Sequence, residues 1–243
     1  MAKKYFSTFF ILISLNLFSQ INYIHYTVKD GLPQMQCMKI IQDSKGYLWI
    51  GTKGGLSKYD GISFKNFFID DGLPDSRIID IKEAENGVIW VLTQSGLSSV
   101  INDQIKHYPA HENFLFKDDN IVIDNSDIGS IWIIEGYYKK RLIKFSNGIY
   151  SNKFTSKKGQ LRGLSFDNLD ESIVFTELNT LGSKLYRQSE DSFNVEHLPQ
   201  GTKWIYKYED SLAITSKKNG SAIYKLTNND TLKLFQFKQN MDI

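Results

Sequence analysis

The chain has 243 residues, of which 41% are hydrophobic, 14% aromatic and 23% charged, a composition typical of folded globular proteins. Lys and Arg number 29 against 27 Asp and Glu, so the formal charge of +2 excludes a strong electrostatic attraction to nucleic acid or to an anionic membrane. The single cysteine, Cys37, excludes an intramolecular disulfide framework and a cysteine-based zinc site.

The N-terminal residues 1–20 are predicted to be a secretory signal peptide. Lys3 and Lys4 precede an apolar run from Tyr5 to Phe18, which is interrupted by polar residues. This run is shorter than the roughly 20 apolar residues that span a bilayer. We therefore expect export to the periplasm, with an uncleaved anchor as the alternative. Residues 21–243 contain no second apolar segment of transmembrane length.

The sequence after residue 20 repeats with a period of about 41 residues. The motif Gly31-Leu32-Pro33 returns as Gly72-Leu73-Pro74, and the apolar segment Tyr47–Thr52 returns as Val88–Thr93, each 41 positions later. Weaker copies of that apolar segment begin at Ser130, Ser172 and Ser211. These five copies indicate five similar structural units.

Each copy of the apolar segment lies between other short segments in which apolar and polar residues alternate. Polar turn pairs such as Asp60-Gly61 and Asn147-Gly148 separate the last two segments of a unit. Four short strands in a repeat of about 40 residues are typical of β-propeller blades. The sequence therefore predicts an all-β fold, a β-propeller-type array of about five four-stranded blades over residues 21–243.

The fourth strand of the predicted blade occurs six times, because Asn22–Val28 adds a copy before the first complete repeat. Two arrangements are left open by this count. Five blades lie within the range of closed propellers, and one terminal strand could complete the last blade of such a ring. The additional strand equally indicates an incomplete, open array that continues in further repeats.

The first repeat closely resembles the two-component regulator propeller repeat. The matching residues are Gly31-Leu32-Pro33, Gln42–Thr52 and Gly54–Gly61. The second repeat keeps Gly72-Leu73-Pro74 and Trp90 but has Leu92 where the pattern has glycine. The later repeats are assigned by their period.

This resemblance implies a function in signalling. Repeats of this family build the exported sensor region of histidine kinases and hybrid two-component proteins. The chain is thus expected to bind an extracellular or periplasmic ligand and to relay to a membrane kinase that is not part of it. It carries no glycine-rich ATP-binding segment or phosphoacceptor region, so no enzyme activity is expected. The alternatives are a stand-alone lectin-like or protein-interaction propeller and, less favoured, a propeller hydrolase or lyase.

Several conspicuous residues are assigned structural roles. Trp49, Trp90 and Trp132 recur at one position of the repeat and are expected to pack between neighbouring blades. His107 and His111 have a metal-like spacing, but Pro109 prevents the helix that this spacing requires. No metal, cofactor or catalytic residue is therefore predicted.

The predicted ligand site follows from the topology of the blade. In an up-and-down blade, the loop between the second and third strands shares one face with the connections between blades. These segments are longer and more varied than the turns at the opposite face, and variable loops on a rigid scaffold commonly bind ligands. Aromatic and cationic or amide side chains there suit an acidic or hydroxyl-rich ligand such as an oligosaccharide. The predicted residues are Lys53, Arg77, Gln94, Tyr137, Tyr138 and Arg141.

Overall fold

The computed structural model describes residues 23–110, 116, 121–124, 127, 129–135, 141–167, 172–178, 183–189 and 192–197, and the backbone of 202–208, 211–216, 220–226 and 231–237. Within these residues the fold is built of β-strands and two 3-10 turns. The predicted all-β class is therefore confirmed.

The strands form four-stranded antiparallel sheets in which each strand pairs with the next one in the chain. The first blade contains β1 (Cys37–Gln42), β2 (Leu48–Thr52), β3 (Leu56–Tyr59) and β4 (Phe64–Phe67). The second contains β5 (Ile78–Glu83), β6 (Ile89–Thr93), β7 (Gly96–Ile101) and β8 (Gln104–Pro109). The third contains β9 (Ile121–Asp124), β10 (Ser130–Glu135), β11 (Arg141–Ser146) and β12 (Ile149–Thr155). The fourth contains β13 (Gln160–Asp167), β14 (Ser172–Leu178), β15 (Lys184–Ser189) and β16 (Ser192–His197).

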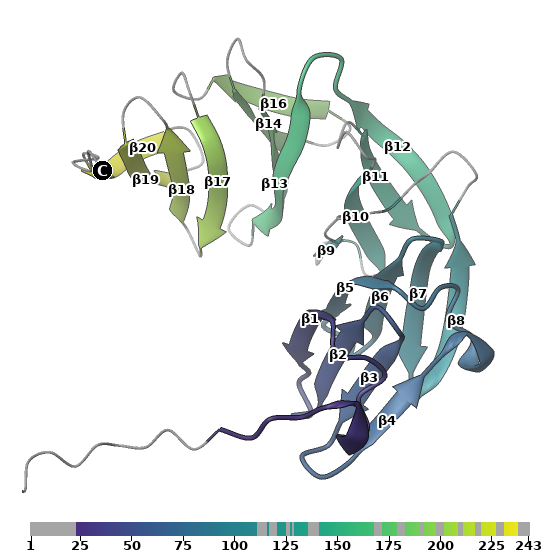
Figure 1. The fold of residues 1–243 in the computed structure, drawn as a ribbon. Coiled ribbons are helices and arrows are strands. Elements are labelled where there is room, and N and C mark those ends of the chain that lie inside the picture. Colours follow the sequence, from purple (N-terminus) through teal and green to yellow (C-terminus); the bar gives the residue numbers. More distant parts are fainter. Residues whose placement is uncertain are drawn as a thin grey trace, which may run out of the picture.

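The number of blades compares with the prediction as follows. Four four-stranded blades, β1–β16, have described side-chain packing, against the about five that the sequence predicts. The fifth repeat is described by its backbone, in which β17 (Thr202–Tyr208), β18 (Ser211–Ser216), β19 (Gly220–Leu226) and β20 (Thr231–Phe237) pair in the same order. Figure 1 shows the sheets following one another along an open arc, so of the two predicted arrangements the structure has the open one.

The predicted fourth-strand copy Asn22–Val28 is wrong for the residues that the structure describes. Residues 23–27 have no strand pairing, and Val28–Asp30 forms a 3-10 turn. No described strand lies beside this segment to accept its backbone hydrogen bonds, and an unpaired strand is not stable in water. A second 3-10 turn, Ile69–Asp71, precedes the second blade at the equivalent place.

The Gly-Leu-Pro motifs end these two 3-10 turns, as expected of backbone turning devices. Gly31 and Gly72 have φ angles of 115° and 105°, a left-handed conformation that favours glycine. The leucines that follow, Leu32 and Leu73, are buried with 7% and 2% exposure. Each motif therefore reverses the chain and places an apolar side chain at the start of a blade.

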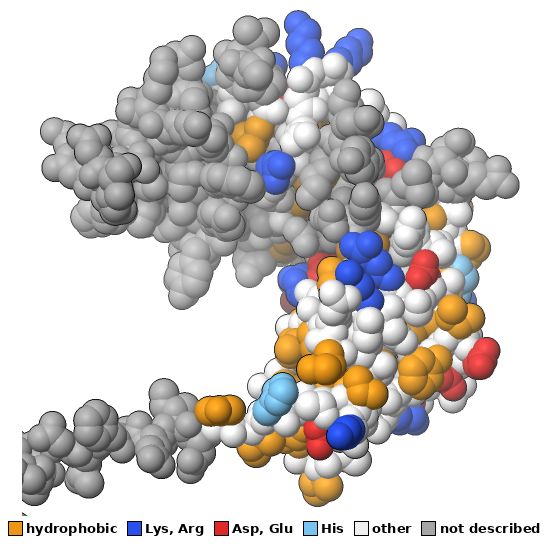
Figure 2. All heavy atoms as spheres, in the orientation of Figure 1, with side chains coloured by type: hydrophobic (Ala, Val, Ile, Leu, Met, Phe, Trp, Pro, Cys, Tyr) orange, Lys and Arg blue, Asp and Glu red, His pale blue; other side chains and the backbone are white. Residues whose placement is uncertain are grey.

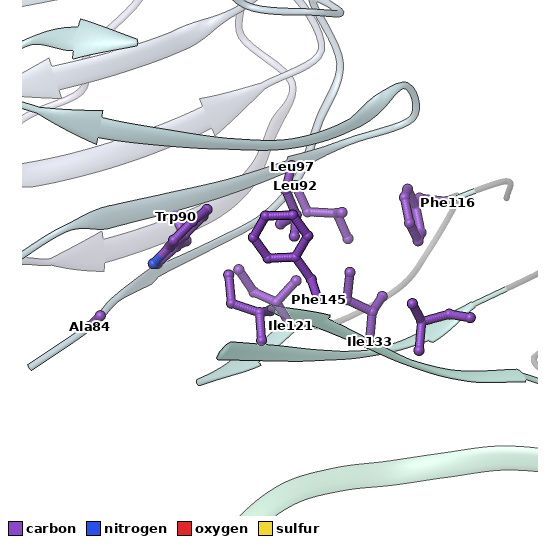
Figure 3. Close-up of a cluster of buried hydrophobic side chains, with 10 residues drawn as sticks. Ala84, Trp90, Leu92, Leu97, Phe116, Ile121, Ile133 and Phe145 are labelled. Carbon is purple, nitrogen blue, oxygen red and sulfur yellow. The ribbon is translucent and has the colours of Figure 1, made fainter. Parts of the chain in front are cut away.

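Neighbouring blades are held together by buried apolar side chains between their sheets, which we call seams. The first seam joins Trp49, Leu56 and Phe67 of the first blade to Ile78, Ile81, Ile89, Val91 and Val100 of the second. The second seam, shown in Figure 3, joins Trp90, Leu92 and Leu97 to Ile121, Ile131, Ile133, Ile143 and Phe145. The third joins Trp132, Ile134 and Leu142 to Leu161, Ile173, Phe175 and Tyr186.

The first strand of each blade lies innermost, because β1, β5, β9 and β13 contact one another in succession. Positions 39, 80 and 121 of these strands lie one period apart and are joined directly. Lys39 Nζ lies 2.9 Å from Asp80 Oδ1, and the Ile121 N–H donates to Asp80 Oδ2 at 2.9 Å. Asp80 is 1% exposed, so both contacts compensate a buried carboxylate. One side chain thus connects three successive blades.

The predicted packing role of the three tryptophans is confirmed, since Trp49, Trp90 and Trp132 are 3%, 6% and 2% exposed. Two of them also make a hydrogen bond that the sequence analysis missed. The indole N–H of Trp49 donates to Asp43 Oδ2 at 2.8 Å, and that of Trp132 donates to Asp124 Oδ2 at 2.8 Å.

Asp43 further accepts the backbone N–H groups of Lys45 and Tyr47 through Oδ1, at 3.0 and 2.9 Å. Its buried carboxylate therefore joins the β1–β2 turn to the tryptophan at the seam. A lysine completes this arrangement in both blades. The Nζ atoms of Lys58 and Lys144 lie 5.3 Å from the ring centroids of Trp49 and Trp132, within cation–π range.

Gly51 is required by the close approach of two blades. A Cβ atom at this position would lie 2.6 Å from Ile78 Cγ2, and Ile78 is fully buried in the first seam. The second repeat has Leu92 at the equivalent position, and its side chain is itself buried in the second seam. The departure from the family pattern at Leu92 therefore reflects a different filling of the space between blades.

Replacing Asp43 by Asn should lower the free energy of unfolding by about 2 kcal/mol, because an amide presents N–H groups to the three donors that the carboxylate accepts. Asp70 is exposed, so Asp70→Asn should change stability by less than about 0.5 kcal/mol. Urea unfolding followed by tryptophan fluorescence measures both. Equal stabilities of the two variants would contradict the role given to Asp43.

Gly51→Ala should destabilise the chain by about 1–3 kcal/mol, because the new methyl group overlaps the Ile78 side chain. The variant Ile78→Ala is also destabilised, since it leaves a cavity in the seam. In the double variant the overlap is gone, so its loss should be smaller than the sum of the single losses by about 1 kcal/mol. Strict additivity in a double-mutant cycle would argue against the overlap.

Candidate functional site

The order of strands gives the arc two different faces. The tight turns between the first and second and between the third and fourth strands lie on one of them, the short-turn face. The turns between second and third strands and the crossings between blades lie on the other, which we call the long-loop face. In the first two blades it comprises residues 29–36, 53–55, 68–77 and 94–95.

The predicted site residues that the structure describes all lie at this long-loop face. Lys53 and Gln94 are exposed in the second-to-third turns of the first and second blades. Arg77 is half-buried directly before β5, and its backbone N–H donates to Asp75 Oδ1 at 2.9 Å. Tyr137 and Tyr138 lie outside the described residues, and a binding role for all of these positions stays a prediction.

Arg141, at the start of β11, is held by a buried carboxylate. Its Nε and Nη2 atoms donate to Glu135 Oε2 and Oε1 at 2.6 and 2.9 Å, and the Glu135 side chain is 1% exposed. Such a bidentate pair has a defined geometry. The guanidinium group is therefore fixed in orientation at the long-loop face, with 30% of the Arg141 side chain exposed.

Glu135 belongs to a repeated position at the long-loop end of the second strand that sequence reasoning did not single out. In the first two blades the residue is threonine: the Thr52 and Thr93 hydroxyls donate to the Gly55 and Gly96 carbonyls at 2.9 and 3.0 Å and close the following turns. In the third and fourth blades the position carries a carboxylate instead. The four residues, Thr52, Thr93, Glu135 and Glu177, are all buried.

Glu177 has hydrogen-bond donors in place of an arginine. The Tyr186 hydroxyl donates to Glu177 Oε2 at 2.9 Å, and the Ser156 hydroxyl contacts Oε1. Burial, together with the neighbouring carboxylate, raises the pKa of Tyr186 to about 12, so its hydroxyl stays protonated and can donate at neutral pH. The 42-residue spacing of positions 93, 135 and 177 is the signal by which the sequence could have revealed this series.

The short-turn face contains a cavity of about 300 Å³ between the first and second blades. The charged side chains around it are already paired. Ser44 donates its backbone N–H and its hydroxyl to Glu83 at 2.7 and 2.6 Å, and Lys58 Nζ donates to Asp103 at 2.9 Å. Lys58 Nζ also lies 4.1 Å from the Tyr47 ring centroid. These partners make the cavity a polar border of the first seam.

Two further observations concern the described part of the chain. It holds no group of three or more His, Cys, Asp or Glu side chains that could bind a metal ion. None of its helical segments is long and apolar enough to cross a membrane. His107 Nδ1 lies 3.2 Å from the Leu97 carbonyl oxygen, and burial lowers the pKa of this imidazole. His111 lies outside the described residues.

Comparison with solved structures places the fold among propellers. The extracellular domain of a putative hybrid two component system from B. thetaiotaomicron is similar over 84% of this chain, with 17% identity and a TM-score of 0.57. The chain spans 28% of the length of that domain. The Dos1 propeller has a TM-score of 0.62 at 11% identity, over 84% of this chain and 59% of its own.

The WD40 domain of SCAP from fission yeast has a TM-score of 0.56 at 10% identity, over 90% of this chain and 57% of its own. At these identities the likeness concerns the fold alone. No curated protein is significantly similar to the sequence.

A family model gives the sequence-level match. Residues 31–54, from the Gly-Leu-Pro turn to the end of β2, match the model described as two component regulator propeller. These residues include the Asp43–Trp49 hydrogen bond and Gly51, which the packing of the first blade requires. The resemblance expected from the sequence is confirmed: the chain carries a two component regulator propeller repeat in its first blade and has a propeller-like fold.

Proposed function

We propose that this chain is an exported, ligand-sensing propeller of a two-component signal transduction system. It binds a ligand outside the inner membrane and biases the activity of a membrane-bound kinase. The single observation that carries the proposal is the two component regulator propeller repeat at residues 31–54. Its support is the fold, which is shared with the extracellular domain of a putative hybrid two component system.

The ligand contacts the long-loop face in this proposal. Lys53 and Gln94 present exposed donors from neighbouring blades, while Arg141 presents an oriented guanidinium from the third. Tyr137 and Tyr138 complete the proposed site. Planar donors and aromatic rings of this kind suit an acidic or hydroxyl-rich molecule such as an oligosaccharide. No pair of carboxylates poised for acid–base catalysis takes part, so we assign binding and not hydrolysis.

The signal is a change in the packing of blades. Donors on different blades can bind one ligand only at certain relative positions of those blades, so ligand binding favours the arrangements that bring the donors together. The seams between blades are apolar and tightly filled, and such interfaces respond by discrete shifts. A partner that contacts two blades would detect such a shift.

Export has a direct test. The chain expressed with its own N-terminus should be recovered from the periplasm without residues 1–20, as read by mass spectrometry of the intact protein. Reversal of the charges at Lys3 and Lys4 to Glu should reduce the processed fraction, because signal peptides require a positive N-terminal region. Recovery of unprocessed chain in the cytoplasm would contradict export.

Binding is tested with a glycan array and then by calorimetry with the oligosaccharide found. The double variant Lys53→Ala/Gln94→Ala should bind that oligosaccharide at least about tenfold more weakly, since it loses a charged and a neutral donor. Lys45→Ala, which removes an exposed lysine from the short-turn face, should bind like the unmodified chain. Unchanged binding in the double variant places the ligand elsewhere, and release of free sugar would favour a hydrolase.

A further inference from the structure

Each blade has a leading face, which packs against the preceding blade, and a trailing face, which packs against the next. In the second blade the leading face is buried in the first seam: Ile81, Ile89 and Val91 are 0%, 3% and 0% exposed. One period earlier in the sequence, the leading face of the first blade presents Ile40, Leu48 and Ile50. The same apolar pattern therefore exists on a blade that has no described blade before it.

The outer part of this face is covered by the chain itself. Tyr26 packs on the third and fourth strands, with its hydroxyl 2.6 Å from that of Tyr59 and its ring centroid 5.4 Å from that of Phe64. Leu32 is buried beside Ile50. These contacts repeat the way in which Phe67 and Leu73 border the first seam.

The inner part of the face, on β1, is uncovered. Ile40 is 57% exposed, whereas its equivalent Ile81 is fully buried. Cys37 is likewise exposed, whereas its equivalent Ile78 is fully buried. Figure 2 shows apolar side chains gathered at this end of the arc, which also carries the exposed side chains of Tyr23, Ile24, Val28, Met35 and Met38. A contiguous exposed apolar surface of this kind marks an interaction site.

We propose that the leading face of the first blade binds the last blade of a second copy of this chain, so that the copies associate head to tail. The contact continues the seam that joins each blade to the next. The strands β17–β20 are paired in the same order as those of the other blades, and they end the arc at the side opposite the first blade (Figure 1). The formal charge of +2 opposes such association only weakly.

A head-to-tail contact joins two different surfaces, so it leaves one leading and one trailing face free in each pair of copies. The copies therefore form either a ring or a longer chain. This inference does not depend on the proposed sensing function, because it rests on the repeat of the seam and on the exposure of Ile40.

The test is analytical ultracentrifugation of the exported chain at increasing concentration. The mass should rise with concentration, and Ile40→Lys should weaken association at least about tenfold, because a charge would be buried in the new seam. Ile62→Lys is the matched control, since Ile62 is 92% exposed in the turn between β3 and β4. A chain that remains monomeric at all concentrations, or an Ile40→Lys variant that associates like the control, overturns the proposal.

A second measurement requires no substitution. The thiol of Cys37 lies on the same strand as Ile40 and is exposed in the single copy. Its rate of alkylation by iodoacetamide should fall severalfold as the concentration of protein rises, because association covers the strand. A rate that does not depend on protein concentration also overturns the proposal, whether or not the Ile40→Lys variant folds.

Discussion

The packing of one blade against the next is the interaction on which the rest of this structure depends. A single four-stranded sheet has two faces and cannot bury both alone, so each blade gains its core only from its neighbours. The three described seams meet this need with apolar residues from adjacent repeats, and Trp49, Trp90 and Trp132 occupy the same place in each. Both the stability and the open end of the array follow from this dependence.

Polar contacts make the apolar seams specific. Asp43 joins a turn to the tryptophan behind it, and Asp80 joins three inner strands. A buried carboxylate is costly without partners, so each of these contacts fixes the relative position of the groups that satisfy it. Apolar burial holds the blades together, whereas these hydrogen bonds determine their register.

The same physics separates the two faces of the arc. At the short-turn face the charged groups around the cavity are paired with one another, as Lys58 is with Asp103. At the long-loop face Lys53 and Gln94 extend into solvent, and Arg141 is oriented from below by Glu135. A ligand gains more from groups that are oriented and accessible than from groups that already have partners. This contrast is why we place the proposed ligand at the long-loop face.

The sequence alone determined the repeat, the four-stranded unit, the family resemblance and the burial of the tryptophans, because these depend on alternation and period within each repeat. It could not determine what lies beside a strand. Asn22–Val28 reads as a strand, yet its described residues have no partner to pair with. Arg141 reads as a free cation, yet it is bound by Glu135, and Asp43 reads as a turn residue, yet it accepts the indole of Trp49. Contacts between side chains of different strands and blades depend on three-dimensional packing, so only the tertiary structure decided them.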